Sequence, residues 1–245
     1  MEIKSGERID DLQAGGLRII QKKGEFCFGS DSVLLSAFAH FKKNASVIDL
    51  GAGSGAISFL LAAHNPDLKI TALEINESAA DRLARGIELN GISERVCAKK
   101  GDIRLVRELY ESASFDGAIS NPPYRQELGN SVSPPLPALR SARQEENVTI
   151  EDIAAAAGYL LRPKARLFLL VPSLRLSEFM KTLSSKHLEP KRVRFIHPKI
   201  ELPSKLAMLE LIKDGKSGLS IEPPLVMMTK DNMETEEVKQ IYSRQ

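Results

Sequence analysis

The sequence has little of what would indicate a secreted, membrane-bound or metal-binding protein. Only two cysteines occur among its 245 residues, Cys27 and Cys97, and they form no CxxC pair. This scarcity argues against a disulfide framework and against a zinc site, so we expect two core thiols and no metal. No apolar run approaches the roughly 20 residues that a membrane-spanning helix needs, and the first ten residues are charged rather than signal-like. We therefore expect a cytoplasmic protein without membrane contact.

The rest of the composition is that of an ordinary globular protein. Hydrophobic residues make up 42% of the chain and charged residues 27%, and the length is sufficient for one sizeable core. The formal net charge is only +2, which permits contact with nucleic acid but does not require it. Composition therefore does not indicate a function, and the sequence motifs must.

Short apolar runs rich in β-formers alternate with longer helical patterns from Ala45 onward. Such alternation is typical of βαβ units on a mostly parallel sheet. The predicted strands cover 46–50, 69–74, 95–99, 115–120, 166–171, 191–197 and 205–213. The predicted helices cover 55–63, 77–90, 103–110, 149–161 and 174–186. The sequence therefore predicts an α/β fold with seven strands.

Two segments break this alternation. Residues 125–147 are irregular and rich in proline and serine, and a long loop after a strand is typical of a lid or a binding loop. Residues 1–44 precede the first predicted strand and include a turn followed by an apolar helix. Because no linker separates two domains, we expect an N-terminal extension over 1–44 and one main domain over 45–245.

The stretch FDGAISNPPYRQ, residues 115–126, ends a predicted strand with an amide, two prolines and an aromatic ring. A simple proline turn explains the strand end, because proline cannot donate to a strand ladder. Alternatively, the Asn121 side-chain oxygen and the Pro122 carbonyl accept the two protons of one planar amine, on which Tyr124 stacks. On this motif alone, the two interpretations stand equal.

The second interpretation has a definite chemistry. An exocyclic or amide nitrogen is a poor nucleophile, because its lone pair is delocalised into the neighbouring π system. Two fixed acceptors draw that lone pair out and stabilise the positive charge that develops on nitrogen, without a strong base. A group such as a methyl can then pass to the nitrogen by direct in-line displacement.

A glycine-rich turn occurs upstream, in VIDLGAGSGAISFLLA. An apolar strand ends in Asp49, and Gly51, Gly53 and Gly55 precede the next helix. Glycines let the backbone turn sharply and let a ligand approach the end of the strand and the helix N-terminus. The spacing does not match the dinucleotide pattern G-x-G-x-x-G, which disfavours a pyrophosphate ligand.

Two acidic residues follow the next predicted strands. Glu74 closes the second strand, where an acidic side chain accepts hydrogen bonds from a ribose diol, and Asp102 follows the third. Each one alone is equally well explained as a helix cap or a solvated turn. Taken with the glycine-rich turn, they indicate one nucleotide crevice, and this crevice favours the amine-binding interpretation of the proline motif.

In chain order, DLGAGSGAISFLLA, ALEIN, GDI and NPPY resemble the motifs of class I S-adenosylmethionine-dependent methyltransferases that act on amines. The resemblance implies a doubly wound, Rossmann-like sheet of seven strands, the last antiparallel, with S-adenosylmethionine across the carboxyl ends of the first strands. It also implies a catalytic role for Asn121, Pro122 and Tyr124. The implied donor-binding residues are Asp49 behind the turn, Gly51 and Gly53 at the methionine part, Glu74 at the ribose and Asp102 at the adenine.

Three further segments resemble the bacterial subfamily that methylates N6 of an adenine beside the anticodon of a valine tRNA: FCFGSDSVLLSAF, SPPLPALRSARQEE and EPKRVRFIHPK. This resemblance implies a tRNA partner and an N-terminal extension that covers the cofactor pocket, with Ser30 and Asp31 by the methionine end. Basic residues in or beside these segments are candidate phosphate contacts, although a water-facing strand explains part of them equally well. These candidates are Arg125, Arg140, Arg143, Lys191, Arg192, Arg194 and Lys199.

Other planar amines remain open at this point. A protein glutamine amide and the N2 amine of a guanine in rRNA present the same NH2 group to Asn121. The relatives that methylate glutamine carry a larger helical N-terminal domain, whereas about 44 residues precede the first strand here. A non-catalytic nucleotide-binding module is a further alternative, in which Asn121 and Tyr124 would be incidental.

Overall fold

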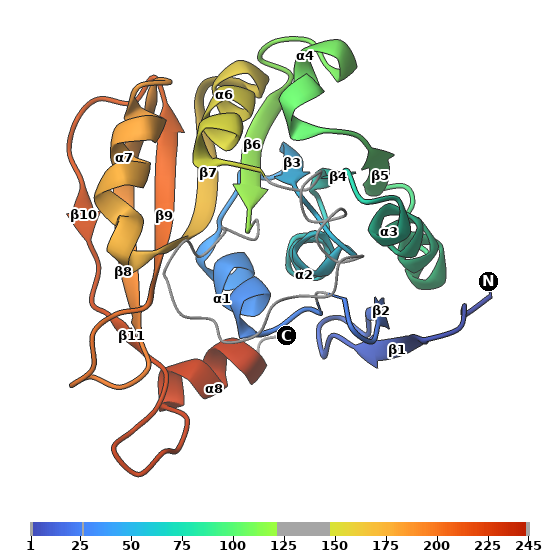
Figure 1. The fold of residues 1–245 in the computed structure, drawn as a ribbon, viewed down its shortest axis with the longest axis horizontal. Coiled ribbons are helices and arrows are strands. Elements are labelled where there is room, and N and C mark those ends of the chain that lie inside the picture. The colour runs from blue at the N-terminus through green and yellow to red at the C-terminus, as the bar shows by residue number, and fades with distance from the viewer. Residues whose placement is uncertain (1, 26, 122–147, 244–245) are drawn as a thin grey trace, which may run out of the picture.

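A computed structural model describes residues 2–25, 27–121 and 148–243. A mostly parallel sheet runs through the molecule, with helices on both of its faces (Figure 1). The strands of this sheet that the sequence predicts are β3 (Ser46–Leu50), β4 (Lys69–Glu74), β5 (Val96–Lys100), β6 (Phe115–Ser120), β7 (Leu161–Pro172), β8 (Leu188–His197) and β9 (Leu206–Lys213).

The order of these strands is β8-β9-β7-β6-β3-β4-β5. Strand β9 runs antiparallel to both β7 and β8, whereas β3, β4, β5, β6 and β7 are parallel to one another. The doubly wound arrangement with an antiparallel last strand is therefore confirmed. Two short strands extend the sheet beyond β8, namely β10 (Ser220–Ile221) and β11 (Leu225–Val226), and both run parallel to it.

The helices divide between the two faces of the sheet (Figure 1). One face carries α1 (Ser30–Phe38), α2 (Ala56–His64), α3 (Glu77–Asn90) and α8 (Glu236–Ser243). The other face carries α4 (Val106–Leu109), α6 (Ile150–Leu160) and α7 (Leu176–Ser184). None of the helices in the described ranges is long and apolar enough to cross a membrane.

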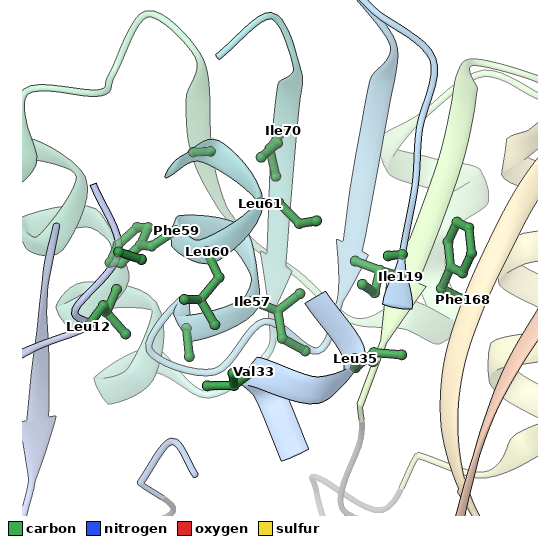
Figure 2. Packing of buried hydrophobic residues seen from close by; sticks show 14 of the residues in the cluster. Leu12, Val33, Leu35, Ile57, Phe59, Leu60, Leu61, Ile70, Ile119 and Phe168 are labelled. Carbon is green, nitrogen blue, oxygen red and sulfur yellow. The ribbon is translucent and has the colours of Figure 1, made fainter. Parts of the chain in front are cut away.

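Each face of the sheet has its own core. Successive side chains of a strand point to opposite faces, so Val47 of β3 joins the core beneath α1, α2 and α3, while Ile48 joins the core beneath α6. Figure 2 shows Val33 of α1 beside Ile57 and Leu60 of α2 in the first core. These contacts fix α1 against the helix that follows the glycine-rich turn.

The N-terminal segment contains a feature that the sequence does not predict. An antiparallel hairpin of β1 (Glu7–Asp11) and β2 (Arg18–Lys22) precedes the predicted helix α1 and packs beside α3. Strand β1 is mostly charged and exposed, so it lacks the apolar alternation that identifies a strand in a sequence. The hairpin is therefore stabilised by tertiary contacts with α3 rather than by a local strand pattern.

Several predicted elements differ in detail. The helices expected over 103–110 and 174–186 each begin as a 3₁₀ turn, η1 (Ile103–Leu105) and η2 (Ser173–Arg175). Strand β7 begins before the predicted residue 166, and its register shifts opposite Phe115 and Gly117, which accommodates Pro163 within an irregular stretch. The expectation of two core thiols is wrong, because Cys97 on the edge strand β5 is exposed and Cys27 is half-buried.

Gly55, the N-cap of α2, generates a prediction for stability. It has φ 97°, and a Cβ there would lie 2.5 Å from Leu83 Cδ1 and 3.1 Å from Phe59 Cζ, two fully buried side chains. We expect Gly55→Ala to lower the free energy of unfolding by about 3 kcal/mol, through backbone strain and overpacking together. Urea denaturation measures this change.

Gly91, the C-cap of α3, is the matched control. Its φ is 63°, but no atom lies within 4 Å of an added Cβ. Gly91→Ala should therefore cost about 1 kcal/mol, from backbone strain alone. Equal losses in the two variants would contradict the packing argument.

Candidate active site

The crevice lies where the order of the strands reverses. Strand β3 pairs with β4 on one side and with β6 on the other, and the chain leaves these two neighbours in opposite directions along the sheet. In open α/β sheets, ligands bind outside the carboxyl ends of the strands at such a switch point. The ends of β3 and β6 carry the glycine-rich turn and Asn121, so the predicted donor and amine sites are neighbours.

A buried hydrogen bond fixes these two strand ends together. The Ser120 hydroxyl donates to the carbonyl oxygen of Leu50 at 2.5 Å, and both residues are completely buried. Asn121 directly follows Ser120 and Gly51 directly follows Leu50, and both Asn121 and Gly51 are only partly buried. The fold therefore brings the start of the glycine-rich turn and the backbone of Asn121 to neighbouring strand ends.

The glycine-rich turn is anchored to β4. The amides of Gly51 and Ala52 both donate to the carbonyl oxygen of Leu73, at 2.9 and 3.0 Å. Gly51 and Gly53 have φ 80° and 57°, the left-handed region that favours glycine. A Cβ at Gly53 would meet no atom within 4 Å, so the turn presents open space to a ligand.

Glu74, the last residue of β4, holds this turn against the start of α3. It is 8% exposed, and its two carboxylate oxygens accept from the amides of Gly53 at 2.7 Å and Asn76 at 2.8 Å. A carboxylate is also stabilised beside a helix N-terminus. Each oxygen can accept more than one hydrogen bond, so the carboxylate retains capacity for the hydroxyls of a ligand.

Asp49 lies beneath the turn and is completely buried. Its Oδ2 accepts from the Ser58 hydroxyl at 2.7 Å, and its Oδ1 has no partner among the described residues. Burial raises the pKa of Asp49 to about 7; the Ser58 hydrogen bond opposes this rise and the charge of Glu74 adds to it. Ionisation of this carboxyl would leave a buried charged oxygen without a partner among the described residues, which is a physical reason for the raised pKa.

Asp102 lies at the turn after β5, beside Glu74. The amide of Gly101 donates to the backbone carbonyl of Glu74 at 2.9 Å, which fixes this turn to the end of β4. The Asp102 carboxylate accepts from the amide of Arg104 at 2.8 Å, and the Arg104 guanidinium holds the pKa of Asp102 below its usual range. The predicted contact to adenine is therefore on the same edge as Glu74, with an arginine partner.

Ser30 and Asp31 are the first residues of α1. Gly29 caps this helix without a side-chain hydrogen bond, and α1 packs against α2. Asp31 is half-buried, and burial raises its pKa. The structure thus places these predicted donor contacts on the helix that faces α2.

Among the described candidates for RNA contact, Lys191, Arg194 and Lys199 all have intramolecular partners. The ammonium groups of Lys191 and Lys199 donate to backbone carbonyls, and Arg194 pairs with Glu237 at 2.6 Å. An RNA role for them stays a prediction. Five other predicted site residues lie outside the described residues, namely Pro122, Tyr124, Arg125, Arg140 and Arg143.

Among the described RNA-contact candidates, Arg192 has the largest set of partners. Its guanidinium pairs with the buried Glu210 at 2.7 Å and with Glu222 at 3.0 Å, and it lies 3.8 Å from the ring centroid of Phe38 at the end of α1. These contacts tie β8 to α1 through a largely desolvated charge. They give Arg192 a structural role, which the sequence did not indicate.

Sequence reasoning missed two side chains that organise the crevice. Ser58 is the only polar residue in the apolar stretch AISFLLA, and it faces Asp49. Ser120 ends an apolar strand and contacts β3. In both cases a lone hydroxyl in an apolar element was the signal, because a buried hydroxyl requires a partner.

The buried carboxyl of Asp49 generates a prediction for pH dependence. The pKa of an aspartate is about 4 in an unfolded chain and about 7 here, so the folded state binds more protons between these values and is destabilised as the pH rises. Relative to Asp49→Asn, we expect the free energy of unfolding of the wild type to fall by about 2 to 3 kcal/mol from pH 5 to pH 8. Urea denaturation at both pH values tests this, and parallel pH profiles would contradict it.

Comparison with known proteins agrees with this geometry. A family model described as the methyltransferase small domain matches residues 17–187. A Porphyromonas gingivalis relative named tRNA1(Val) (adenine(37)-N6)-methyltransferase is 30% identical over 185 residues, covering 67% of this chain and 71% of that protein. A Bacteroides fragilis protein of the same name is 28% identical over 181 residues, covering 74% and 75%.

Solved structures share the fold. A predicted O-methyltransferase, protein Atu636 from Agrobacterium tumefaciens, superimposes with a TM-score of 0.71 at 21% identity, covering 87% of this chain and 96% of that one. P. horikoshii TYW2 in complex with MeSAdo has a TM-score of 0.59 at 14% identity, covering 86% and 73%. With a family model that spans most of the sequence, the chain belongs to the methyltransferase small domain family.

Proposed function

We propose that this methyltransferase transfers the methyl group of S-adenosylmethionine to N6 of an adenine in the anticodon-loop region of a valine tRNA. The observation that carries the proposal is the switch point, where the glycine-rich turn follows β3 and Asn121 follows β6, the strand paired with β3. Support for the substrate comes from the relatives in Porphyromonas gingivalis and Bacteroides fragilis, which are named for adenine 37 of tRNA1(Val).

The donor fits the crevice. Glu74 would accept hydrogen bonds from the ribose hydroxyls, because its carboxylate closes β4 and retains acceptor capacity. Asp102, which follows the neighbouring strand β5, would accept a hydrogen bond from the adenine amine. The methionine part would lie along Gly51 and Gly53, where the backbone turns with no side chain in the way. When bound, S-adenosylmethionine supplies an electrophilic methyl group on its sulfonium.

The N-terminal extension would form the opposite wall. Residues 1–44 place α1 against α2, and Ser30 and Asp31 lie at the end of α1 from which the backbone amides point outward. An ammonium group at the methionine end of the donor would be attracted to the Asp31 carboxylate. The extension would therefore cover the pocket, while Asp49 would support the turn from beneath.

The amine would be activated by acceptors rather than by a base. The Asn121 side-chain oxygen and the Pro122 carbonyl would accept hydrogen bonds from the two N–H groups of N6 and stabilise the charge that develops there. The methyl group would pass by in-line displacement: the C–N bond would form as the C–S bond breaks, S-adenosylhomocysteine would leave, and the methylated nitrogen would release one proton to solvent. Tyr124 would stack on the adenine ring and hold the nitrogen in line with the donor. The tRNA backbone would be held by Arg125, Arg140, Arg143, Lys191, Arg194 and Lys199.

Asn121→Ala tests the catalytic assignment. Donor affinity should be retained, because the donor residues lie on β3, β4 and β5, while the rate of tRNA methylation should fall by about 10²- to 10³-fold, as when one charge-stabilising contact is removed. Calorimetry with S-adenosylhomocysteine and transfer of a labelled methyl group to tRNA measure the two quantities.

Asn65→Ala is the matched control, since Asn65 caps the far end of α2 and should leave both quantities unchanged. Unchanged methylation in Asn121→Ala would reject the catalytic role. The same assay with rRNA and with a glutamine-bearing release factor separates the substrates: methylation of either in place of tRNA would contradict the proposed adenine substrate.

A further inference from the structure

A buried arginine lies behind the glycine-rich turn. The Arg82 side chain on α3 is 2% exposed, and each nitrogen of its guanidinium has a different partner. Nε donates to the Ser54 hydroxyl at 3.2 Å, Nη1 to the Ser78 hydroxyl at 2.7 Å and Nη2 to the Glu25 carboxylate at 2.5 Å. Because a buried charge is costly without such partners, all three contacts contribute to keeping this cation in place.

The three partners belong to different parts of the crevice. Ser54 is within the glycine-rich turn, Ser78 is in the first turn of α3 after Glu74, and Glu25 is in the N-terminal extension between β2 and α1. Arg82 therefore connects the turn to the extension across the start of α3. A lysine could not make this set of contacts, because its single ammonium lacks the planar fork of a guanidinium.

A second buried side chain fixes the same part of the extension. Gln21 at the end of β2 is 3% exposed, and its Oε1 accepts from the amide of Phe28 at 2.8 Å. The chain that leads to Ser30 and Asp31 is thus held by Gln21 on one side and through Glu25 by Arg82 on the other. These two anchors hold the segment before the α1 N-terminus, in addition to the packing of α1 against α2.

The geometry points to Arg82 as a positioning residue for the methyl donor. We infer that it fixes the distance between the glycine-rich turn and the segment before Ser30, so that the two walls are preorganised for the methionine part of the donor. This inference rests on the proposed function, because it takes S-adenosylmethionine as the ligand. Arg82 does not touch the reacting atoms and acts through Ser54 and Glu25.

Arg85, one turn further along α3, provides a matched control. It also anchors the extension, because its guanidinium pairs with Glu7 at 2.6 Å and with Asp81 at 2.7 Å. Within the described residues, its hydrogen bonds reach the hairpin and α3 but not the glycine-rich turn. A variant at Arg85 therefore loosens the extension without acting on the turn.

Donor affinity is the first measurement. We expect Arg82→Lys to weaken binding of S-adenosylhomocysteine about tenfold, with the rate at saturating donor kept within about twofold. Arg85→Lys should keep that affinity within about twofold, whatever its effect on the unfolding temperature. Equal affinity losses in the two variants would overturn the positioning role.

Hydrogen exchange of the ligand-free protein is the second measurement, and it does not depend on the identity of the donor. Ser54→Ala removes the contact of Arg82 with the turn, so we expect faster exchange in residues 20–25 of the extension as well as in residues 51–55. A change confined to 51–55 would overturn the inference. If the wild type binds no S-adenosylhomocysteine but Ser54→Ala still speeds exchange in both segments, the proposed function is refuted while the coupling between the turn and the extension stands.

Discussion

The carboxylate of Glu74 is the contact on which the rest of the crevice depends. Its two oxygens bind the amides of Gly53 and Asn76, so one side chain joins the glycine-rich turn to the start of α3. Its backbone carbonyl accepts from Gly101, which brings the turn after β5 to the same edge. The segments that follow β3, β4 and β5 are therefore held together by the side chain and backbone of one buried acid.

Three further ionisable side chains lie around Glu74 and the glycine-rich turn, and each is in a different electrostatic environment. Asp49 lies beneath the turn with a pKa near neutrality because it is buried, whereas Asp102 keeps its charge beside Arg104. Arg82 places a buried cation on the far side of the same turn. Arg82 and Glu74 each form a hydrogen bond with a residue of this turn, Ser54 and Gly53, and such anchoring lowers the ordering cost of binding a flexible ligand.

The sequence predicts those parts of the fold that local chemistry determines. The strands over 46–50, 69–74 and 115–120 have the predicted bounds. The first ends before Gly51 and the third before Asn121 and Pro122, while the second ends two residues before Asn76, the N-cap of α3. The methyltransferase family is confirmed as well. The β1–β2 hairpin was not predicted, because β1 is mostly charged and exposed and lacks apolar alternation. The contact of Arg82 with Glu25 was not predicted, because the two residues are 57 positions apart and such a pairing leaves no local pattern.

The proposed methylation of N6 of an adenine in tRNA leaves a modified nucleoside that can be measured directly. Mass analysis of valine tRNA from cells with and without the gene would identify the base and the substrate together. We expect N6-methyladenosine to disappear from the anticodon-loop fragment when the gene is removed and to return when it is restored. Unchanged N6-methyladenosine in that fragment, or loss of a methylated guanine instead, would contradict it.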